Sequence, residues 1–421
     1  MRRGALGRTT AALSSLLVGT ALVAVGPLLT PASAATTTYT MPATGAVKLT
    51  GHGYGHGHGM SQYGAQGAAL KGLTWQQITS FYYPGTTRAT LSRTVRVLIS
   101  ADTSRDVVVA PRSNLRLLAT ATREVRLLPA NGATRWRLTV TADNSTAVDY
   151  LLAGTWKRWW TFTGDGAFLA GGRPIRLYYG GTSHQFRGRL YAARPTAGST
   201  DRDTVNLLSL ESYLRGVVPA EMPSSWDPDA VASQAVAARS YAAWDLSTPS
   251  RATHYDICDT TQCQVYGGYD REAAGSNVAI DATRGVILTH NGTPAFTQFS
   301  SSSGGWTSAG SVPYLPAKQD PYDGWKRADG SYGNPNHNWT TTVDVAAIER
   351  RWPALGNLTS IEVLSRDGNG EWGGRINKLR LRGTKDGKAT LVDNVYGSDF
   401  RMKLGLKSTY FTFSGVPTKT T

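Results

Sequence analysis

The chain has 421 residues, with 44 lysines and arginines against 29 aspartates and glutamates, and its formal charge at neutral pH is +15. Basic proteins of this kind meet anionic polymers, such as nucleic acid or the polymers of a cell wall. The sequence shows no basic helix, zinc-finger spacing or aromatic RNA-binding signature, which argues against nucleic acid as a partner. The charge is scattered along the chain, so an ordinary soluble surface explains it as well as cell-wall association does.

The N-terminus has the pattern of an export signal. Three arginines precede an apolar run over residues 11–29, and Ala-Ser-Ala at positions 32–34 is typical of a cleavage site. We therefore expect residues 1–34 to be a cleaved signal peptide, and loss of its three arginines leaves a charge of +12. The mature chain is expected to be secreted, extracytoplasmic and associated with the cell wall, with no transmembrane span. The pair Arg2-Arg3 leaves the general and the twin-arginine export routes open.

The first part of the mature chain contains a Gly/His-rich stretch. Residues 35–50 are rich in Thr and Ala, and we expect them to form a flexible connector. Residues 51–88 start with the sequence GHGYGHGHGMSQ, and their pattern predicts short helices near residues 62–70 and 75–81. Pro84-Gly85 then predicts a turn.

The remaining chain divides into a β-rich part and a mixed part. Over residues 91–204 apolar and polar residues alternate between turn signals such as Asn131-Gly132, which predicts an antiparallel β-rich domain. Residues 205–413 mix helical and strand patterns, and 414–421 are expected to be a tail. There is no regular alternation of strand and helix, so the predicted fold class is α+β, with a β-rich antiparallel domain joined to a mixed helix/strand domain.

One carboxylate, Glu221, lies between two prolines. Pro219 and Pro223 each fix their own φ and bias the preceding residue towards extended backbone, so we expect Glu221 on a stiff turn. A helix over residues 227–245 should follow, with Asp227 as its N-cap and Pro228 at its first position. Such a turn would hold an acid in a semi-enclosed position, whereas the alternative is an ordinary surface Glu.

Several long motifs occur in a consistent order around and after this Glu. Residues 207–241 read LLSLESYLRGVVPAEMPSSWDPDAVASQAVAARSY, and residues 258–268 read CDTTQCQVYGG. Residues 301–307 (SSSGGWT), 313–323 (PYLPAKQDPYD) and 400–413 (FRMKLGLKSTYFTF) follow. Together these motifs resemble the stage II sporulation protein D / LytB family, which is defined by a SpoIID-type domain. The resemblance covers nearly the whole mature chain.

The order of one segment departs from that family. The Gly/His-rich motif, its short helix and the YYPG turn normally come last, but here they occupy residues 51–87. We interpret this difference as a circular permutation, because chain termini often lie close together at the surface and tolerate such rearrangement. The interpretation predicts that the backbone near Gly51 lies beside the strand that ends at Phe413.

The resemblance implies that Glu221 is the catalytic residue of a peptidoglycan lytic transglycosylase. Such an enzyme cleaves MurNAc-GlcNAc strands with formation of 1,6-anhydro-MurNAc ends, in cell-wall remodelling or sporulation. One Glu can serve as acid and base there, and its pKa should be raised by partial burial. The nearest possible second carboxylates, Asp227 and Asp229, are explained by helix capping. The LytB side of the family implies the alternative of a non-catalytic peptidoglycan-binding enhancer of an N-acetylmuramoyl-L-alanine amidase.

Further residues are expected to bind the substrate or to orient Glu221. The planar guanidinium of Arg239 suits a carboxylate, and the hydroxyl-rich run at 301–303 suits a sugar. The glycines between the histidines make a helix improbable there, so we expect a tight loop whose imidazoles bond the glycan or Glu221, with a metal site as the alternative. A nucleophilic serine is not supported, since no Gly-x-Ser-x-Gly elbow is present. The full set is Arg239, His52, His56, His58, Gln62, Ser301, Ser302 and Ser303.

The chain contains two cysteines, Cys258 and Cys263. In an exported protein they predict one disulfide, which would hold the CDTTQC loop near the helix that follows Glu221. The alternative is a zinc site formed by His254, Cys258 and Cys263. We therefore expect that the protein binds no cofactor. The alternative is that it binds zinc at this site. The expected partners are peptidoglycan glycan strands, together with anionic wall polymers or another wall hydrolase.

Overall fold

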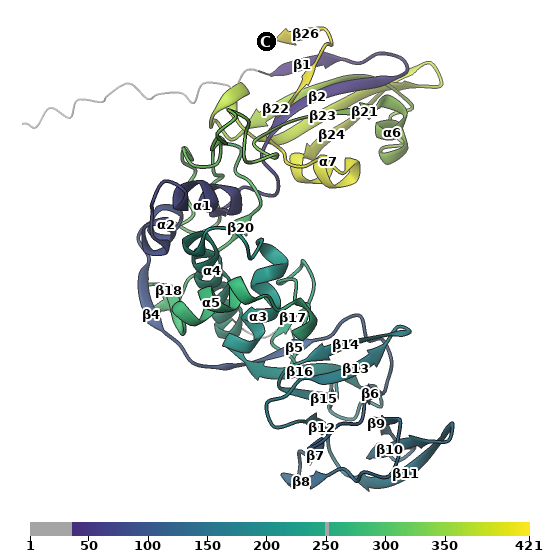
Figure 1. Ribbon diagram of the computed structural model, residues 1–421. Coiled ribbons are helices and arrows are strands. Elements are labelled where there is room, and N and C mark those ends of the chain that lie inside the picture. Colours follow the sequence, from purple (N-terminus) through teal and green to yellow (C-terminus); the bar gives the residue numbers. More distant parts are fainter. Residues whose placement is uncertain (1–35, 249–251) are drawn as a thin grey trace, which may run out of the picture.

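The computed structural model describes residues 36–248 and 252–421 (Figure 1). The expected signal peptide lies outside these residues. Among the described helices, none has both the length and the hydropathy required to cross a lipid bilayer. Helices and mostly antiparallel strands are mixed along the chain, which confirms the α+β fold class.

The β-rich domain contains two sheets. One has the strand order β17-β5-β16-β15-β12-β7-β8 and the other β11-β10-β9-β6-β13-β14. The expected boundary at residue 204 lies inside β16, because residues 203–207 of that strand pair with β15 and residues 205–209 pair with β5. The strands are β5 Thr94–Leu98, β6 Val107–Val109, β7 Arg116–Ala119, β8 Glu124–Leu127, β9 Arg135–Val140, β10 Thr146–Leu152, β11 Thr155–Phe162, β12 Gly166–Leu169, β13 Ile175–Tyr179, β14 Thr182–Phe186, β15 Arg189–Ala193, β16 Asp203–Ser209 and β17 Ile257–Cys258.

A helical module packs against this domain. Its centre is α4, which contacts α1, α2, α3 and α5 (Figure 1). Most side chains of α4 are buried alanines, valines and serines, so neighbouring helices approach from several sides. The elements are α1 Gln62–Ala69, α2 Trp75–Tyr82, α3 Leu210–Glu221, α4 Pro228–Ser247 and α5 Ala274–Ala282, with the short 3-10 helix Tyr269–Arg271 and the strands β3 Met60–Ser61, β4 Thr87–Thr90, β18 Val286–His290, β19 Thr293–Pro294 and β20 Phe299–Ser300.

The start of α4 follows from local signals. The Asp227 carboxylate accepts a hydrogen bond from the backbone N–H of Asp229 at 3.0 Å, and Pro228 occupies the first helical position.

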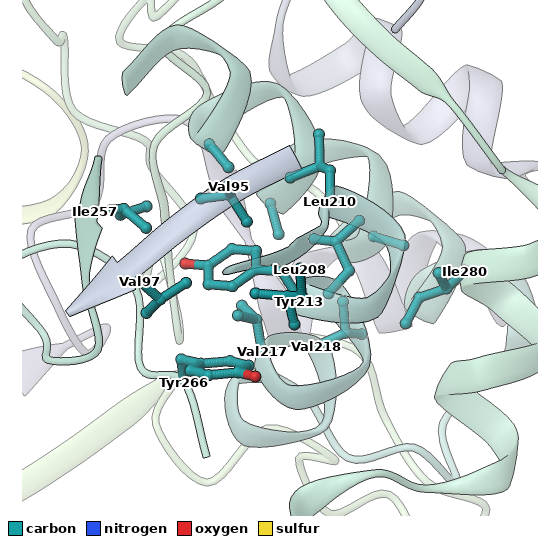
Figure 2. Packing of buried hydrophobic residues seen from close by; sticks show 14 of the residues in the cluster. Val95, Val97, Leu208, Leu210, Tyr213, Val217, Val218, Ile257, Tyr266 and Ile280 are labelled. Carbon is teal, nitrogen blue, oxygen red and sulfur yellow. The ribbon is translucent and has the colours of Figure 1, made fainter. Parts of the chain in front are cut away.

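Helix α3 packs on the β-rich domain through its apolar face. Tyr213 and Val217 pack on Val95 and Val97 of β5 (Figure 2). The β-rich domain and the helical module therefore share one hydrophobic core.

A third unit, the C-terminal sheet module (residues 36–52 and 338–421), has a separate hydrophobic core. The expected mixed domain over 205–413 is therefore two units, because two clusters of buried side chains form instead of one. The sheets have the orders β24-β23-β22-β1-β26 and β21-β2-β25. The elements are β1 Thr37–Thr40, β2 Ala46–His52, β21 Asn338–Asp344, α6 Val345–Arg351, β22 Asn357–Arg366, the 3-10 helix Glu371–Gly373, β23 Ile376–Lys385, β24 Lys388–Tyr396, α7 Gly397–Leu404, β25 Phe411–Ser414 and β26 Thr418–Thr420.

Two expectations about the ends of the chain are wrong. Residues 35–50 are not a flexible connector, since β1 and β2 are both paired on two sides, and 414–421 are not a free tail, since β26 pairs with β1. The physical reason is the alternation of buried and exposed side chains along β2. Val47 and Leu49 point into the core while Lys48 between them faces outwards, which suits a strand.

The pairing of β2 bears on the order of segments. Leu49 lies opposite Phe413, and Gly51 lies opposite Phe411, in an antiparallel pair with β25. This is the adjacency that a circular permutation predicts. Strand β21 pairs with the other edge of β2, so the N-terminal strand is central in its sheet.

We expect Leu49→Ala to lower the free energy of unfolding by about 2–5 kcal/mol, because it leaves a cavity beneath a fully buried side chain. Lys48→Ala, on the exposed face of the same strand, is the control and should change it by less than about 0.5 kcal/mol. Chemical denaturation followed by circular dichroism measures both. Equal, small effects would show that the N-terminal strand does not contribute to the core of this module.

Candidate functional site

Glu221 is the last residue of α3 rather than part of a turn, which corrects the expectation from the sequence. Pro219 lies within the final turn of the helix. The residue with extended backbone is Met222, with φ −136° and ψ 137°, because Pro223 disfavours the helical region for its predecessor. The helix therefore ends directly after Glu221.

At this helix end Glu221 lines a cavity of about 360 Å³. One wall is the loop of residues 261–265, which contains Cys263. Gln298 and Phe299 also line the cavity, together with His56 and Tyr241. Five segments that are distant in the sequence therefore meet around one carboxyl group.

The pKa of the Glu221 carboxyl group is shifted by its burial in this cavity. Burial raises the pKa of its carboxyl group above the usual range, because the charged form loses hydration. Hydrogen bonds from the backbone N–H of Val265 and from the Gln62 side chain oppose this shift, because they stabilise the carboxylate. The net direction is upwards, so Glu221 keeps its proton to higher pH than an exposed Glu does.

Two other residues expected at the site lie close to Glu221. Gln62, at the first position of α1, bonds the carboxyl group and also reaches Gln234 on α4, with 3.4 Å between Nε2 and Oε1. His56 lines the same cavity, and its ring stacks on that of His58 with the centroids 4.9 Å apart. Burial, followed by the neighbouring positive groups, lowers the pKa of His56 to about 3. His56 is therefore a neutral imidazole at ordinary pH.

Arg239 does not belong to the cavity, which corrects its expected role. Its side chain is fully buried and forms two parallel hydrogen bonds with Glu211, of 2.9 and 2.8 Å. It also donates to the backbone carbonyls of Val286 and Ile280. With its donors directed at these groups, Arg239 can neither contact a substrate nor orient Glu221 directly.

The serine run is also structural rather than sugar-binding at two of its three positions. Ser302 and Ser303 are buried, and their hydroxyl groups donate to Asp323 at 3.0 Å and to Asp320 at 2.8 Å. Ser301 is half-buried, and its hydroxyl oxygen accepts a 3.4 Å hydrogen bond from Asn336. The expectation that Ser302 and Ser303 approach a sugar is therefore wrong.

His52 also lies outside the lining of the Glu221 cavity. Its Nε2 is 2.8 Å from Glu371, its Nδ1 is 2.7 Å from Asn338, and its ring stacks on Trp372. These contacts hold it within the C-terminal sheet module, so the histidines expected to act together are divided between two places.

Several lining residues, among them Tyr241 and Gln264, were not recognised from the sequence. Tyr241 lines the cavity, and its ring centroid lies 5.5 Å from that of Phe296. Gln264 accepts a hydrogen bond from the Tyr213 hydroxyl and donates to the carbonyl of Ala238. Neither residue carries a local signal, since only the fold brings these segments together.

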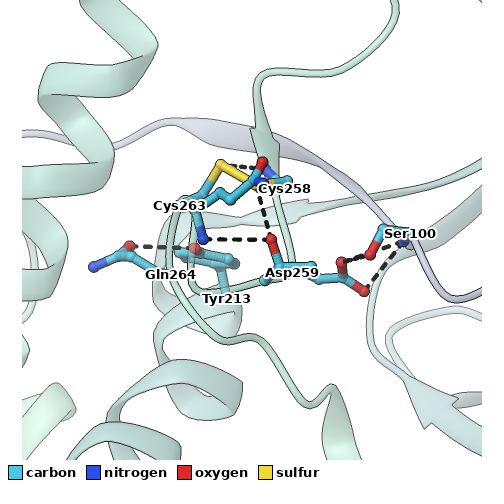
Figure 3. The surroundings of a disulfide bond; sticks show 8 residues. Ser100, Tyr213, Cys258, Asp259, Cys263 and Gln264 are labelled. Carbon is cyan, nitrogen blue, oxygen red and sulfur yellow. Dashed lines mark hydrogen bonds between the residues drawn. A yellow bond between two sulfur atoms is a disulfide. The ribbon is translucent and has the colours of Figure 1, made fainter. Parts of the chain in front are cut away.

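The two cysteines form a disulfide with a Cα–Cα distance of 5.5 Å. Figure 3 shows it beside Gln264, with the Asp259 carboxylate bonded to Ser100 of the β-rich domain. The bridge ties Cys263, which belongs to the loop that lines the Glu221 cavity, to Cys258 in β17. His254, the third member of the alternative zinc set, lies 2.6 Å from Asp203 instead.

Comparison with known proteins finds similarity in the part of the chain that carries Glu221. Residues 199–290 match the family model described as stage II sporulation protein. The chain carries a SpoIID-type segment. This segment includes α3 with Glu221, the disulfide loop and α4, and therefore much of the cavity.

Curated relatives extend the match. The chain is 37% identical over 144 residues to the amidase enhancer of Bacillus subtilis (strain 168), covering 33% of this chain and 18% of that protein. It is 30% identical over 239 residues to the stage II sporulation proteins D of Bacillus subtilis (strain 168) and Bacillus amyloliquefaciens, covering 50% of this chain and 62% of each. The resemblance to the SpoIID/LytB-type family is thereby confirmed, although the chain spans less than two thirds of the length of these relatives.

We expect Gln62→Leu to raise the pKa of Glu221 further, because the carboxylate loses a hydrogen bond that stabilises its charged form. Titration of the Glu side-chain carboxyl carbons by NMR, assigned with a Glu221→Gln sample, measures the shift. Gln76→Leu on α2, whose side chain does not line the cavity, is the control and should leave it unchanged. A pKa that falls or stays constant in Gln62→Leu would contradict the assigned contact.

Proposed function

We propose that the protein is a peptidoglycan lytic transglycosylase that cleaves MurNAc-GlcNAc strands and leaves 1,6-anhydro-MurNAc ends. The observation that carries the proposal is the Glu221 carboxyl group, which lines a cavity at a helix end and has a raised pKa. A carboxyl group that keeps its proton to higher pH than an exposed Glu is better suited to protonate a departing sugar oxygen.

The reaction needs no water. Glu221 donates its proton to the glycosidic oxygen as the bond from C1 to that oxygen breaks, and positive charge develops at C1. The C6 hydroxyl of the same MurNAc attacks C1, and its proton passes to the Glu221 carboxylate. The products are a new 1,6-anhydro ring and a free hydroxyl on the departing sugar, and the acid is restored.

The composition of the cavity supports an intramolecular nucleophile. A hydrolysing glycosidase normally needs a second carboxylate opposite the first. Among the described residues that line this cavity, Glu221 is the only acidic one. Asp227 and Asp229 are engaged elsewhere, as the cap of α4 and as the acceptor of the Trp75 N–H at 2.8 Å.

The neighbouring side chains fit supporting roles. Gln62 stabilises the carboxylate that remains after proton transfer, so it favours departure of the proton. The neutral His56 adds no positive charge next to the centre that becomes positive, and its imidazole can bond a sugar hydroxyl. The aromatic rings of Tyr241 and Phe299 line the cavity and can stack against a sugar ring.

A role in cell-wall remodelling or sporulation is part of the same proposal. It is supported by the names of the relatives and by the basic composition of the chain, which suits an anionic wall. The N-terminal sequence pattern supports export to that compartment.

The identity of 37% to a protein named amidase enhancer favours a second candidate function. In that case the cavity binds a glycan strand without cutting it, and the chain increases the activity of an N-acetylmuramoyl-L-alanine amidase on peptidoglycan. The lining described above would serve binding alone.

We expect Glu221→Gln to reduce formation of anhydro-muramyl products from purified glycan strands by about 100-fold or more, the usual contribution of a general acid. The replacement has nearly the same shape and cannot donate the same proton. Mass spectrometry quantifies the products. Glu124→Gln, an exposed carboxylate on β8, is the matched control and should retain full activity. No product from the unmodified chain would defeat the proposal.

For the second candidate, the chain is added to an N-acetylmuramoyl-L-alanine amidase acting on intact peptidoglycan, and released stem peptides are measured. If the transglycosylase proposal holds, any stimulation should be lost in Glu221→Gln, because it depends on cleavage. Equal stimulation by both forms, with no anhydro products, would favour the enhancer.

A further inference from the structure

A second cavity, of about 390 Å³, is also lined by His56. Because His56 lines both cavities, the two lie next to one another. The first is lined largely by the SpoIID-type segment, whereas the second is lined largely by the C-terminal sheet module, including Arg375, Lys378 and Arg401. The surface next to the Glu221 cavity therefore belongs to a different unit of the fold.

Arg375 is the most enclosed of these cations. Its side chain is 3% exposed, and its Nη2 donates to the carbonyl of Ser303 at 2.7 Å. Its Nε and Nη1 are buried and have no hydrogen-bond partner among the described residues. Burial lowers the pKa of Arg375 to about 10, so the group stays charged at neutral pH. Buried N–H donors without acceptors are costly, and here they belong to a charged group that lines a cavity.

The other two cations leave the positive charge uncompensated. Arg401 donates through Nε to the carbonyls of Leu406 and Lys407, and Lys378 lies 5.8 Å from the ring centroid of Tyr396. In the part of the chain that the structure describes, none of the three cations forms a salt bridge, and the cavity lining contains no carboxylate.

The nearest carboxylates do not neutralise this cluster by contact. Asp367 and Asp323 favour the charge of Arg375 electrostatically. However, Oδ1 of Asp367 accepts the backbone N–H groups of Arg375 and Asn369, and Asp323 is occupied by Ser302 and His337. Arg375 is buried and Lys378 and Arg401 are half-buried around the same cavity, so an external anion bound there would compensate their charge, which is most unfavourable for the buried Arg375.

The Gly/His-rich stretch shapes this cavity as well. Gly57 has a φ of +81°, and a Cβ there would lie 2.4 Å from Nη2 of Arg375. The backbone at Gly57 thus covers the guanidinium and needs a glycine for both reasons. His58, next to it, lines the cavity from the same stretch.

We propose that this second cavity is a subsite that binds a carboxylate of the glycan strand whose neighbouring linkage lies at Glu221. The inference rests on the proposed function for the identity of the polymer, while the preference for an oxyanion rests on the three cations. Peptidoglycan carries carboxylates on its muramic acid lactyl groups, when these are free, and on its stem peptides. Guanidinium and ammonium groups recognise both by charge-assisted hydrogen bonds.

Binding is measured in the full chain carrying Glu221→Gln, so that no strand is cut. The probes are peptide-free glycan strands, the same strands after conversion of their carboxylates to amides, and strands that retain stem peptides. We expect amidation to weaken binding of the peptide-free strands by at least about tenfold, the effect of losing charge-assisted hydrogen bonds. Tighter binding of strands with stem peptides than of peptide-free strands would assign the carboxylate to the peptide instead.

Lys378→Gln and Arg401→Gln should each weaken binding of the carboxylate-bearing strands by about tenfold and leave binding of the amidated strands unchanged. Lys385→Gln removes one charge from the exposed end of β23 and is the matched control, expected to have no effect. Arg375→Gln should act in the same direction, and a thermal melt shows whether that variant is folded.

Unequal outcomes separate the two proposals. If the parent chain forms no anhydro products but discriminates amidated strands through Lys378 and Arg401, the subsite stands and the transglycosylase proposal fails. If products form but neither Lys378→Gln nor Arg401→Gln weakens binding of the carboxylate-bearing strands, the subsite is overturned. Competition by poly(glycerol phosphate) that is stronger than that by carboxylate-bearing strands would also overturn it, because the cavity would then serve a phosphate polymer.

Discussion

The position of Glu221 depends on a buried ion pair ten residues away, between Glu211 near the start of α3 and Arg239 in the middle of α4. The same carboxylate accepts the backbone N–H of Gly285, and the same guanidinium donates to carbonyls of α5 and β18. Removing one partner of such a pair leaves a buried charge unpaired and lowers the free energy of unfolding by about 3–5 kcal/mol. Helices α3 and α4 therefore cannot slide past one another, and the end of α3 stays about 15 Å along the axis from this anchor.

A second anchor joins the Gly/His-rich stretch to the serine run. The fully buried Asp323 accepts hydrogen bonds from Ser61 at 2.7 Å, from Ser302 at 3.0 Å and from the backbone N–H of Gly304. Burial opposes its ionisation, but these bonds and the one from His337 hold its pKa below the usual range. Because Ser61 is also the N-cap of α1, the network fixes the helix whose first residue is Gln62. Hydroxyl groups that look suited to a sugar thus serve to place a residue that contacts Glu221.

Features that depend on neighbouring residues could be predicted from the sequence, whereas pairing between strands far apart in the chain could not. Capping signals placed α4 within two residues, because Asp227 and Pro228 act on their immediate neighbours. In contrast, β1 pairs with strands more than 300 residues away, and nothing in its Thr-rich sequence specifies those partners. Arg239 illustrates the same limit at the site. Glu211 and Glu221 both precede it, and only the length of α3, which separates them by nearly three turns, decides that Glu211 is the one within reach.

The position of the Gly/His-rich stretch early in the chain has a mechanical consequence. Hydrogen bonds between strands depend on their positions in space, and loop-closure entropy grows only slowly with loop length, so a strand supplied from the other end of the chain can fill the same place. Here that strand is β2, fixed between β21 and β25 in the C-terminal sheet module, while α1 is fixed against α4 in the helical module. The backbone between them carries His56 and Gly57 and is therefore held at both ends. Since His56 lines both cavities, the shape of each cavity depends on how this short stretch is held by the two modules.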